Sequence, residues 1–195
     1  EKMFGLCRKT EHFMSLSVGN GIGGALFLDG KLYRGAFGAA GEVGSCRMDE
    51  IVLKKRSTRK RDTLENLASA RGITDIYIKL GGKKKIDGEV PDALTISKMA
   101  KEGDALACET FNIEGRYLGQ VIASSCMLLN PEKVIIGGGV AMSFNLFKQS
   151  LLETVAQEAH IFAMGTPAKI QVTALGYDAG LLGAAAVALQ AEGDT

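Results

Sequence analysis

Short apolar runs alternate along the chain with longer stretches in which apolar residues recur at helical spacing. The first runs predict three short strands of a hairpin-rich edge, at Phe13–Val18 and within Ala25–Tyr33. A long helix is predicted from Asp104 to Leu129, where Asn130-Pro131 ends the periodic pattern. The following residues predict a strand at 133–136, a helix at 142–160, a strand at 169–175 and a helix of small residues at 178–190. This alternation predicts an α/β fold, in which helices cover the faces of a sheet.

Three other stretches give weaker signals. Glu1–Lys9 is typical of the tail of a helix, and because neither an initiator Met nor a cap precedes it, we expect the chain to be a fragment. Thr63–Arg71 predicts a helix with Asp62 as its N-cap. The polar stretch from Thr74 to Asp92, which contains a Gly-Gly pair, predicts a surface excursion or a small subdomain.

Composition narrows the class of protein. A chain of 195 residues with 46% hydrophobic content can bury one core, and its net charge of +1 gives no general attraction to nucleic acids or anionic membranes. Neither a signal peptide nor an apolar stretch long enough to span a bilayer is found in the sequence, so we expect a cytoplasmic protein without a membrane partner. The cysteines are too far apart for a zinc ribbon or a disulfide framework, and we expect mostly buried thiols. They are Cys7, Cys46, Cys108 and Cys126.

Two glycine-rich turns, Gly19-Asn20-Gly21-Ile22-Gly23-Gly24 and Gly137-Gly138-Gly139, each follow a predicted strand. Glycine lets amide N–H groups approach an anion without a Cβ in the way. A dinucleotide fingerprint would have to open a helix, whereas the residues after Gly24 predict a hairpin, so that interpretation is poor. A phosphate-facing hairpin and a purely structural turn remain open for the first turn. The second is a strand-loop-helix junction whose helix N-terminus could face an anion.

Four motifs occur in order along the chain: Ser17–Gly35, Ala40–Gly44, Leu64–Ser69 and Val134–Val140. Together they resemble the C-terminal half of the ROK family, which groups bacterial sugar kinases with sugar-responsive transcriptional repressors. The resemblance covers nearly the whole chain. It implies an actin-like ATPase (ribonuclease H-like) lobe, a mixed sheet flanked by helices, as the C-terminal lobe of a two-lobe protein. Residues 1–195 would form this lobe, with a polar excursion at about 45–95, and the N-terminal lobe would be absent from the chain.

The resemblance also assigns roles to residues. Glu42 and Glu65 match two family glutamates that accept hydrogen bonds from sugar hydroxyls, a task that suits carboxylates because they present several acceptor lone pairs. Without the motif, two solvated loop charges would be the better interpretation. Ser45 stands where many members have a histidine that contacts the sugar and binds zinc.

The glycine turns would bind ATP. By the resemblance, the first turn lies near the terminal phosphates, through Gly19, Asn20, Gly21 and Gly23. The second turn lies near the α-phosphate and the adenosine, through Gly137, Gly138 and Gly139. ATP and Mg²⁺ are therefore the expected cofactors.

The family's cysteine-rich zinc loop falls here on Arg56–Thr63, which contains no cysteine. Hydroxyl and guanidinium groups cannot form a thiolate site, so we expect no structural zinc. The replacement creates a basic run, Lys54–Arg61. A solvated loop is the favoured interpretation of this run, ahead of a contact with phosphate or nucleic acid, because no aromatic residues or recognition-helix pattern accompany it.

The resemblance implies an ATP-dependent kinase for a hexose or an N-acetylhexosamine. The family's general base is an Asp expected just upstream of Glu1, so no catalytic residue is expected within this chain, and the fragment alone should be inactive. The alternative is the effector-binding lobe of a sugar-responsive regulator, which would contact DNA only through an upstream helix-turn-helix. A homodimer is expected in either case.

Overall fold

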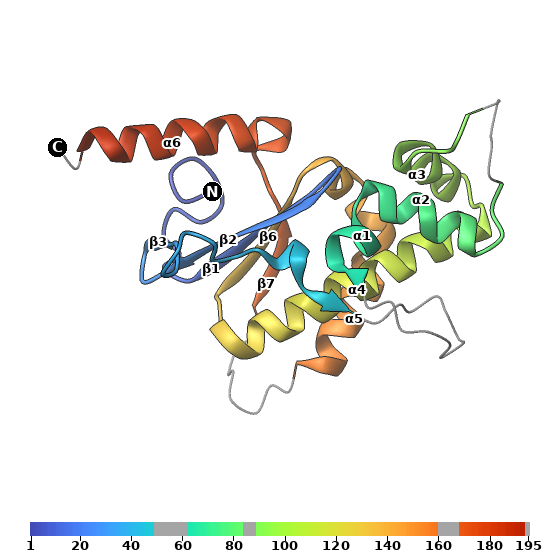
Figure 1. Ribbon diagram of the computed structural model, residues 1–195, viewed down its shortest axis with the longest axis horizontal. Helices are drawn as coiled ribbons and strands as arrows, with labels where there is room; N and C mark the ends of the chain where they lie inside the picture. Colours follow the sequence, from blue (N-terminus) through green and yellow to red (C-terminus); the bar gives the residue numbers. More distant parts are fainter. Residues whose placement is uncertain (49–61, 84–88, 160–167, 194–195) are drawn as a thin grey trace.

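The computed structural model describes residues 1–48, 62–83, 89–159 and 168–193, and its centre is a five-stranded sheet with the order β3-β2-β1-β6-β7 (Figure 1). The strands are β1 (Phe13–Val18), β2 (Ile22–Leu28), β3 (Lys31–Tyr33), β6 (Lys133–Gly137) and β7 (Lys169–Val172). The β1–β2 and β2–β3 pairs are antiparallel, whereas β6 is parallel to both β1 and β7. The sheet is therefore mixed and flanked by helices, as the sequence predicts.

The helices occupy three places around this sheet (Figure 1). Two long helices, α4 and α5, lie against one face, α6 lies on the other side, and the short helices α1 to α3 pack beyond the end of the sheet. Their bounds are α1 (Leu64–Ala68), α2 (Ala70–Lys79), α3 (Ala93–Lys101), α4 (Ala105–Leu129), α5 (Phe144–Glu158) and α6 (Ala179–Gly193). Three 3₁₀ turns, η1 (Val43–Ser45), η2 (Gly139–Ser143) and η4 (Gly176–Asp178), and a two-residue ladder of β4 (Arg47–Met48) with β5 (Asp62–Thr63) complete the described part.

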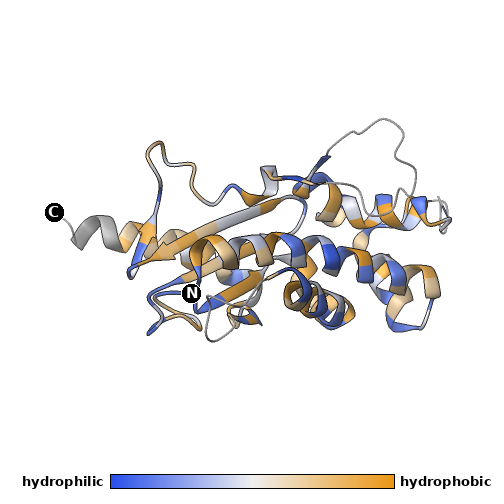
Figure 2. Ribbon diagram, turned by 90° about the horizontal axis from the view of Figure 1, so that it is seen from below, coloured by the Kyte–Doolittle hydropathy of each residue, from blue (hydrophilic) through white to orange (hydrophobic). Residues whose placement is uncertain are grey.

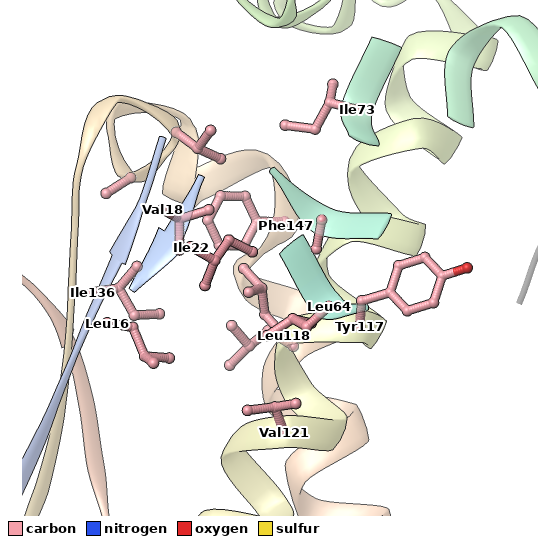
Figure 3. Packing of buried hydrophobic residues seen from close by; sticks show 14 of the residues in the cluster. Leu16, Val18, Ile22, Leu64, Ile73, Tyr117, Leu118, Val121, Ile136 and Phe147 are labelled. Carbon is pink, nitrogen blue, oxygen red and sulfur yellow. The ribbon is translucent and has the colours of Figure 1, made fainter. Parts of the chain in front are cut away.

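The main core lies between the sheet and the long helices (Figure 3). Leu16 and Val18 of β1 point into it because side chains alternate along a strand, and Leu118 of α4 and Phe147 of α5 meet them. In Figure 2 the sheet is mostly hydrophobic in colour, whereas the helices alternate between hydrophobic and hydrophilic residues. Such amphipathic helices are stabilised mainly by burying their apolar stripe against the sheet.

A smaller cluster covers the opposite face of the sheet. Phe13 stacks on Phe27 with ring centroids 4.8 Å apart, and Cys7 and Ile135 are buried beside them. Residues 1–9 cover this cluster as a series of hydrogen-bonded turns, in which the Gly5 N–H donates to the Glu1 carbonyl over 3.0 Å. The predicted helix tail at Glu1–Lys9 is therefore wrong, because these turns follow the sheet surface instead of continuing a helical ladder.

The ends of α4 lie where the sequence predicts them. The Asp104 carboxylate accepts a hydrogen bond from the Ala107 N–H over 2.8 Å at the N-terminus. At the C-terminus, Asn130 adopts a left-handed conformation with φ of 43°, and Pro131 follows. These two signals define the helix to within one residue of its predicted bounds.

The predicted helix at Thr63–Arg71 is two helices. Ser69 has an extended conformation between α1 and α2, and Thr63, not Asp62, is the N-cap that accepts from the Asn66 N–H. Part of the predicted polar excursion also belongs to the core, since Ile76 and Tyr77 of α2 are buried. The sequence predicts a surface segment here because polar residues surround these two apolar side chains and obscure their helical spacing.

The expectation of mostly buried thiols is confirmed in part. Cys7 and Cys126 are buried, and this burial raises the pKa of both thiols, while Cys108 is half-buried and Cys46 is exposed. The basic run Lys54–Arg61 lies outside the described residues. No helix in the described ranges is long and apolar enough to cross a membrane.

Helices α4 and α5 approach each other closely at Gly115 and Gly119. A Cβ at Gly119 would lie 2.7 Å from the Thr154 Cβ and 2.9 Å from the Leu151 carbonyl oxygen. We expect Gly119→Ala to lower the free energy of unfolding by about 1–3 kcal/mol, because the backbone of α5 must shift. Urea denaturation of the chain measures the change.

Gly183→Ala on α6 is the matched control, since a Cβ there meets nothing within 4 Å. It should stabilise the chain by about 0.5–1 kcal/mol through helix propensity alone. Equal effects of the two substitutions would contradict the close packing of α4 on α5.

Candidate functional site

The first glycine turn joins β1 to β2 and is tied to the helical side of the molecule. The Gly19 N–H donates to the Gly21 carbonyl over 2.9 Å, and the Gly19 carbonyl accepts from the Ala70 N–H, at the start of α2, over 2.8 Å. Asn20 is exposed at the tip, and Gly23 lies within β2, where a Cβ would meet nothing within 4 Å. Because a strand and not a helix follows the turn, the rejection of the dinucleotide fingerprint is confirmed.

Glu65 lies directly against this turn. It is in the first turn of α1, and its Oε2 accepts a hydrogen bond from the Ile22 N–H over 2.9 Å. A Cβ at Gly21 would lie 2.6 Å from the same oxygen. The glycine at this position therefore leaves the space that the carboxylate occupies.

Glu42 and Ser45 lie on a loop that packs against the start of β2. The loop is closed by the Ser45 N–H, which donates to the Glu42 carbonyl over 3.1 Å. A side chain at Gly44 would overlap the Ile22 carbonyl oxygen. Both Glu42 and Ser45 are exposed.

Two hydrogen-bonded links connect this loop to α1. The Leu64 N–H donates to the Cys46 carbonyl over 2.9 Å, and Arg47 of β4 pairs with Thr63 of β5. The loops of Glu42 and Glu65 are thus held together by backbone contacts. Glu42 also lines a cavity of about 760 Å³ beside α4, and the described lining of that cavity does not include Glu65.

The second glycine turn lies next to the first. The strands β1 and β6 run parallel, with Ser17 opposite Gly137, so their carboxyl ends deliver both turns to one edge of the sheet. A Cβ at Gly19 would be 3.9 Å from the Gly139 N–H nitrogen. Gly138 has φ of 87° and ψ of 174°, a conformation that is essentially restricted to glycine, and its backbone lies against Val18. The predicted strand-loop-helix junction is confirmed, with η2 inserted before α5.

A cavity of about 290 Å³ opens where the two turns meet. Gly19, Asn20 and Gly139 line one side, and the helices α2, α3 and α4 line the other. The remaining described lining residues are Ala70, Ile73, Asp92, Ala93, Leu94, Ser97, Lys101, Phe111, Val140, Met142, Ser143 and Tyr177. The described lining therefore combines apolar side chains with one lysine, one carboxylate and two serines.

Two polar features shape this cavity. The hydroxyls of Ser97 and Ser143 are 2.7 Å apart and join α3 to η2. Asp92 caps α3, and the hydrogen bond from the Thr95 backbone N–H holds the pKa of its carboxyl below the usual value. Sequence reasoning did not single out Ser97, Lys101 or Tyr177, because no motif marks them. The packing of α3 brings Ser97 and Lys101 to the cavity, and η4 brings Tyr177.

The opposite face of the sheet carries a cavity of about 340 Å³ beneath α6. Ser15, Ser17, Gly138 and Glu1 are among its lining residues. The Glu1 carboxylate accepts hydrogen bonds from the Thr173 hydroxyl and from the Leu6 N–H, the latter over 2.9 Å. Several apolar side chains of α6 are solvent-exposed, with Leu181 at 73%. This side of the lobe is therefore apolar and open.

Possible metal-ligating side chains are not clustered in the described ranges. These ranges contain no group of three or more His, Cys, Asp or Glu side chains arranged to hold a metal ion. The segment that replaces the family's zinc loop is outside these ranges up to Arg61, so the expectation of no structural zinc stays a prediction.

Comparisons with known proteins agree on one family. A model described as the ROK family matches residues 1–191. The xylose repressor of Caldicellulosiruptor bescii is 33% identical over 97% of this chain and 49% of its own length. The glucokinase of Halalkalibacterium halodurans is 29% identical over 89% of this chain and 55% of its own. The chain thus spans about half the length of these curated relatives.

A solved structure confirms the fold. The ROK glucokinase of Streptomyces griseus, in complex with glucose and AMPPNP, superposes with a TM-score of 0.81 and 26% identity. The match covers 97% of this chain and 64% of that one. The predicted actin-like ATPase lobe is therefore confirmed.

The close approach of the second turn to β1 is testable at adjacent glycines. Gly138→Ala should lower the free energy of unfolding by about 1–3 kcal/mol, because alanine is strained at this φ and ψ. Its Cβ would also lie 2.8 Å from the Val18 nitrogen. Thermal unfolding measures the loss.

Gly139→Ala is the control, since a Cβ there meets nothing within 4 Å. Its melting temperature should stay near that of the parent chain. If both alanines were equally tolerated, the close approach of the second turn to β1 would be contradicted.

Proposed function

The chain belongs to the ROK family, and we propose that it is the C-terminal lobe of an ATP-dependent kinase for a hexose or an N-acetylhexosamine. The observation that carries the proposal is the meeting of the two glycine turns at one sheet edge, with a Gly19 Cβ position only 3.9 Å from the Gly139 nitrogen. Each turn has an exposed residue, Asn20 in the first and Gly139 in the second, and two adjacent turns suit a chain of phosphates better than a single anion.

In this proposal the nucleotide lies across both turns. Its terminal phosphates approach Gly19, Asn20, Gly21 and Gly23, and its α-phosphate and ribose approach Gly137–Gly139. The base then enters the 290 Å³ cavity, where Tyr177 and Met142 line the wall with 80% and 62% of their surface exposed. Open space at Gly23 and Gly139 supports the close approach of a ligand.

The sugar is proposed to bind beside the phosphates. The Glu65 Oε2 accepts a hydrogen bond from the Ile22 N–H, which fixes the carboxylate. In this proposal Oε1 accepts from a sugar hydroxyl. Glu42 and Ser45, held on the neighbouring loop, would accept from further hydroxyls. Fixed acceptors of this kind orient the attacking hydroxyl and reduce the entropy lost in the reaction.

The remaining parts of the reaction are assigned outside this chain. We propose that a second, N-terminal lobe faces the 340 Å³ cavity and the exposed side of α6, and that an Asp preceding Glu1 accepts the proton of the attacking hydroxyl. Mg²⁺, which neutralises charge on the phosphates during the transfer, would be held mainly by those phosphates. We further propose a cytoplasmic homodimer without structural zinc.

A second candidate function is the effector-binding lobe of a sugar-responsive regulator. Two observations favour it: the 33% identity to a xylose repressor along 97% of the chain, and Ser45 in place of the usual histidine. This protein would bind a sugar through the same glutamates. It would contact DNA only through an additional helix-turn-helix.

The deciding experiment is ADP release by the full-length protein with Mg-ATP and a panel of hexoses and N-acetylhexosamines. Turnover is expected with at least one sugar. Glu65→Ala and Glu42→Ala should each lower kcat/KM for that sugar about tenfold to hundredfold, because each removes a charged hydrogen-bond acceptor.

Glu109→Ala, which removes an exposed carboxylate from α4, is the matched control and should leave kcat/KM unchanged. No turnover across the panel, together with sugar binding by calorimetry, would replace the kinase by the regulator. Turnover that survives both site substitutions would contradict the sugar site.

The base end of the nucleotide site is tested at Lys101, which is exposed and lines the cavity at the end of α3. Lys101→Ala should raise KM for ATP severalfold while kcat and KM for sugar stay constant. Lys98→Ala, one turn earlier and outside the described lining of that cavity, should have no effect. If both variants had the same KM for ATP, the proposal that the nucleotide lies next to α3 would be contradicted.

A further inference from the structure

Helix α4 carries an acid in the middle of the core. Glu114 is 0% exposed, and neither of its carboxylate oxygens has a hydrogen-bond partner among the residues that the structure describes. Buried polar groups in proteins are nearly always hydrogen-bonded, and buried carboxylates nearly always paired. The position therefore needs a physical explanation that the proposed activity does not supply.

Glu114 faces the side of α4 on which the short helices pack. It lies three and four residues before Tyr117 and Leu118, and side chains at these spacings share one helix face. Figure 3 places Tyr117 and Leu118 next to Leu64 of α1. Gly115 and Gly119 point instead toward α5. Helices α1 and α2 both pack on α4, so this spacing directs the acid toward them and away from the α4–α5 contact.

No charged group on the surrounding helices neutralises it. All charged side chains on α1 and α2 are exposed, and these are Glu65, Arg71, Asp75 and Lys79. The charged side chains on α3 and α5 are exposed as well: Lys98, Lys101, Lys148, Glu153 and Glu158. Burial alone raises the pKa of the Glu114 carboxyl well above its ordinary value.

We propose that Glu114 is a proton-dependent latch that holds α1 and α2 against α4. With the carboxyl protonated, the short helices stay closed over it. When it loses its proton, the carboxylate has to reach water, and the helices open to admit it.

The helices that move away from α4 are α1 and α2, and not α5, because their contact with α4 is the weaker one. Helix α1 has only five residues and is separated from α2 by the extended Ser69, whereas α5 meets α4 backbone to backbone at two glycines. Elements with few buried contacts open at the lowest free energy. Movement of the short helices would break the Glu65 bond to Ile22 and the Ala70 bond to Gly19, and so loosen the first glycine turn.

The sign of the pH dependence follows from the raised pKa. Below the ordinary value of 4.5 the acid is protonated in both open and closed states, and the full closing stability is present. As the pH rises from 4.5 toward the raised pKa, only the open state ionises, so closing weakens by up to tenfold per pH unit. Above the raised pKa the loss levels off.

The test is hydrogen exchange of the full-length protein between pH 5 and pH 9, corrected for the intrinsic exchange rate. In the parent protein, protection of the Ala70 and Ile22 amides should fall steeply with pH, while the amides of α5 keep theirs. Glu114→Gln should remove this slope, and Glu109→Gln, an exposed acid on the same helix, should retain it. This readout does not depend on whether the protein is a kinase.

Glu114→Leu, which replaces the acid by an apolar side chain, covers the case in which the buried amide of the Gln variant prevents folding. In this variant, protection of the Ala70 and Ile22 amides should not change with pH, and at pH 8 it should be greater than in the parent protein. A slope that persists in either variant, or one that appears equally in α5, overturns the latch. A ¹³C titration that gives Glu114 an ordinary pKa overturns it as well.

Discussion

The backbone of Ile22 is the contact on which the candidate site depends. Its N–H binds the carboxylate of Glu65, and its carbonyl oxygen lies where a side chain at Gly44 would have to be. The loop with Glu42 and the helix with Glu65 therefore both lie against a single residue at the start of β2. Because main-chain atoms have few soft degrees of freedom, this arrangement positions both glutamates more tightly than two independent loops could.

Behind this contact, parallel pairing of β1 with β6 decides where the glycine turns lie. Parallel strands end at the same edge, so turns more than one hundred residues apart in the chain become neighbours. Glycine at Gly138 and Gly139 permits this approach and leaves amides open, at a cost in chain entropy that ordinary turns avoid. Side chains of α4 and α5 pack against β1 and β6 in the main core.

The candidate site has two parts, a rigid frame and a less stable cover. The frame consists of the sheet, α4 and α5, whereas α1 to α3 complete the cavity and hold Glu65. An acid buried beneath the cover opposes stability, since a hydrophobic residue of similar size would pack there without an ionisation penalty. Regions that must admit ligands are generally drawn from the less stable parts of a fold, and the position of Glu114 fits that division.

The sequence by itself determined the elements with strong local signals. The helix Ala105–Leu129 follows from its spacing and its two caps, and the glycine turns with Glu65 follow from motifs in a recognisable order. Only the tertiary structure decided that Ser69 interrupts a helix, that Lys101 lines the same cavity as the glycine turns and that Glu114 is buried without a partner among the described residues. Local spacing encodes which face of an element is apolar, but it does not encode which distant element covers that face. The meeting of side chains is set by long-range packing, which overrides local preference.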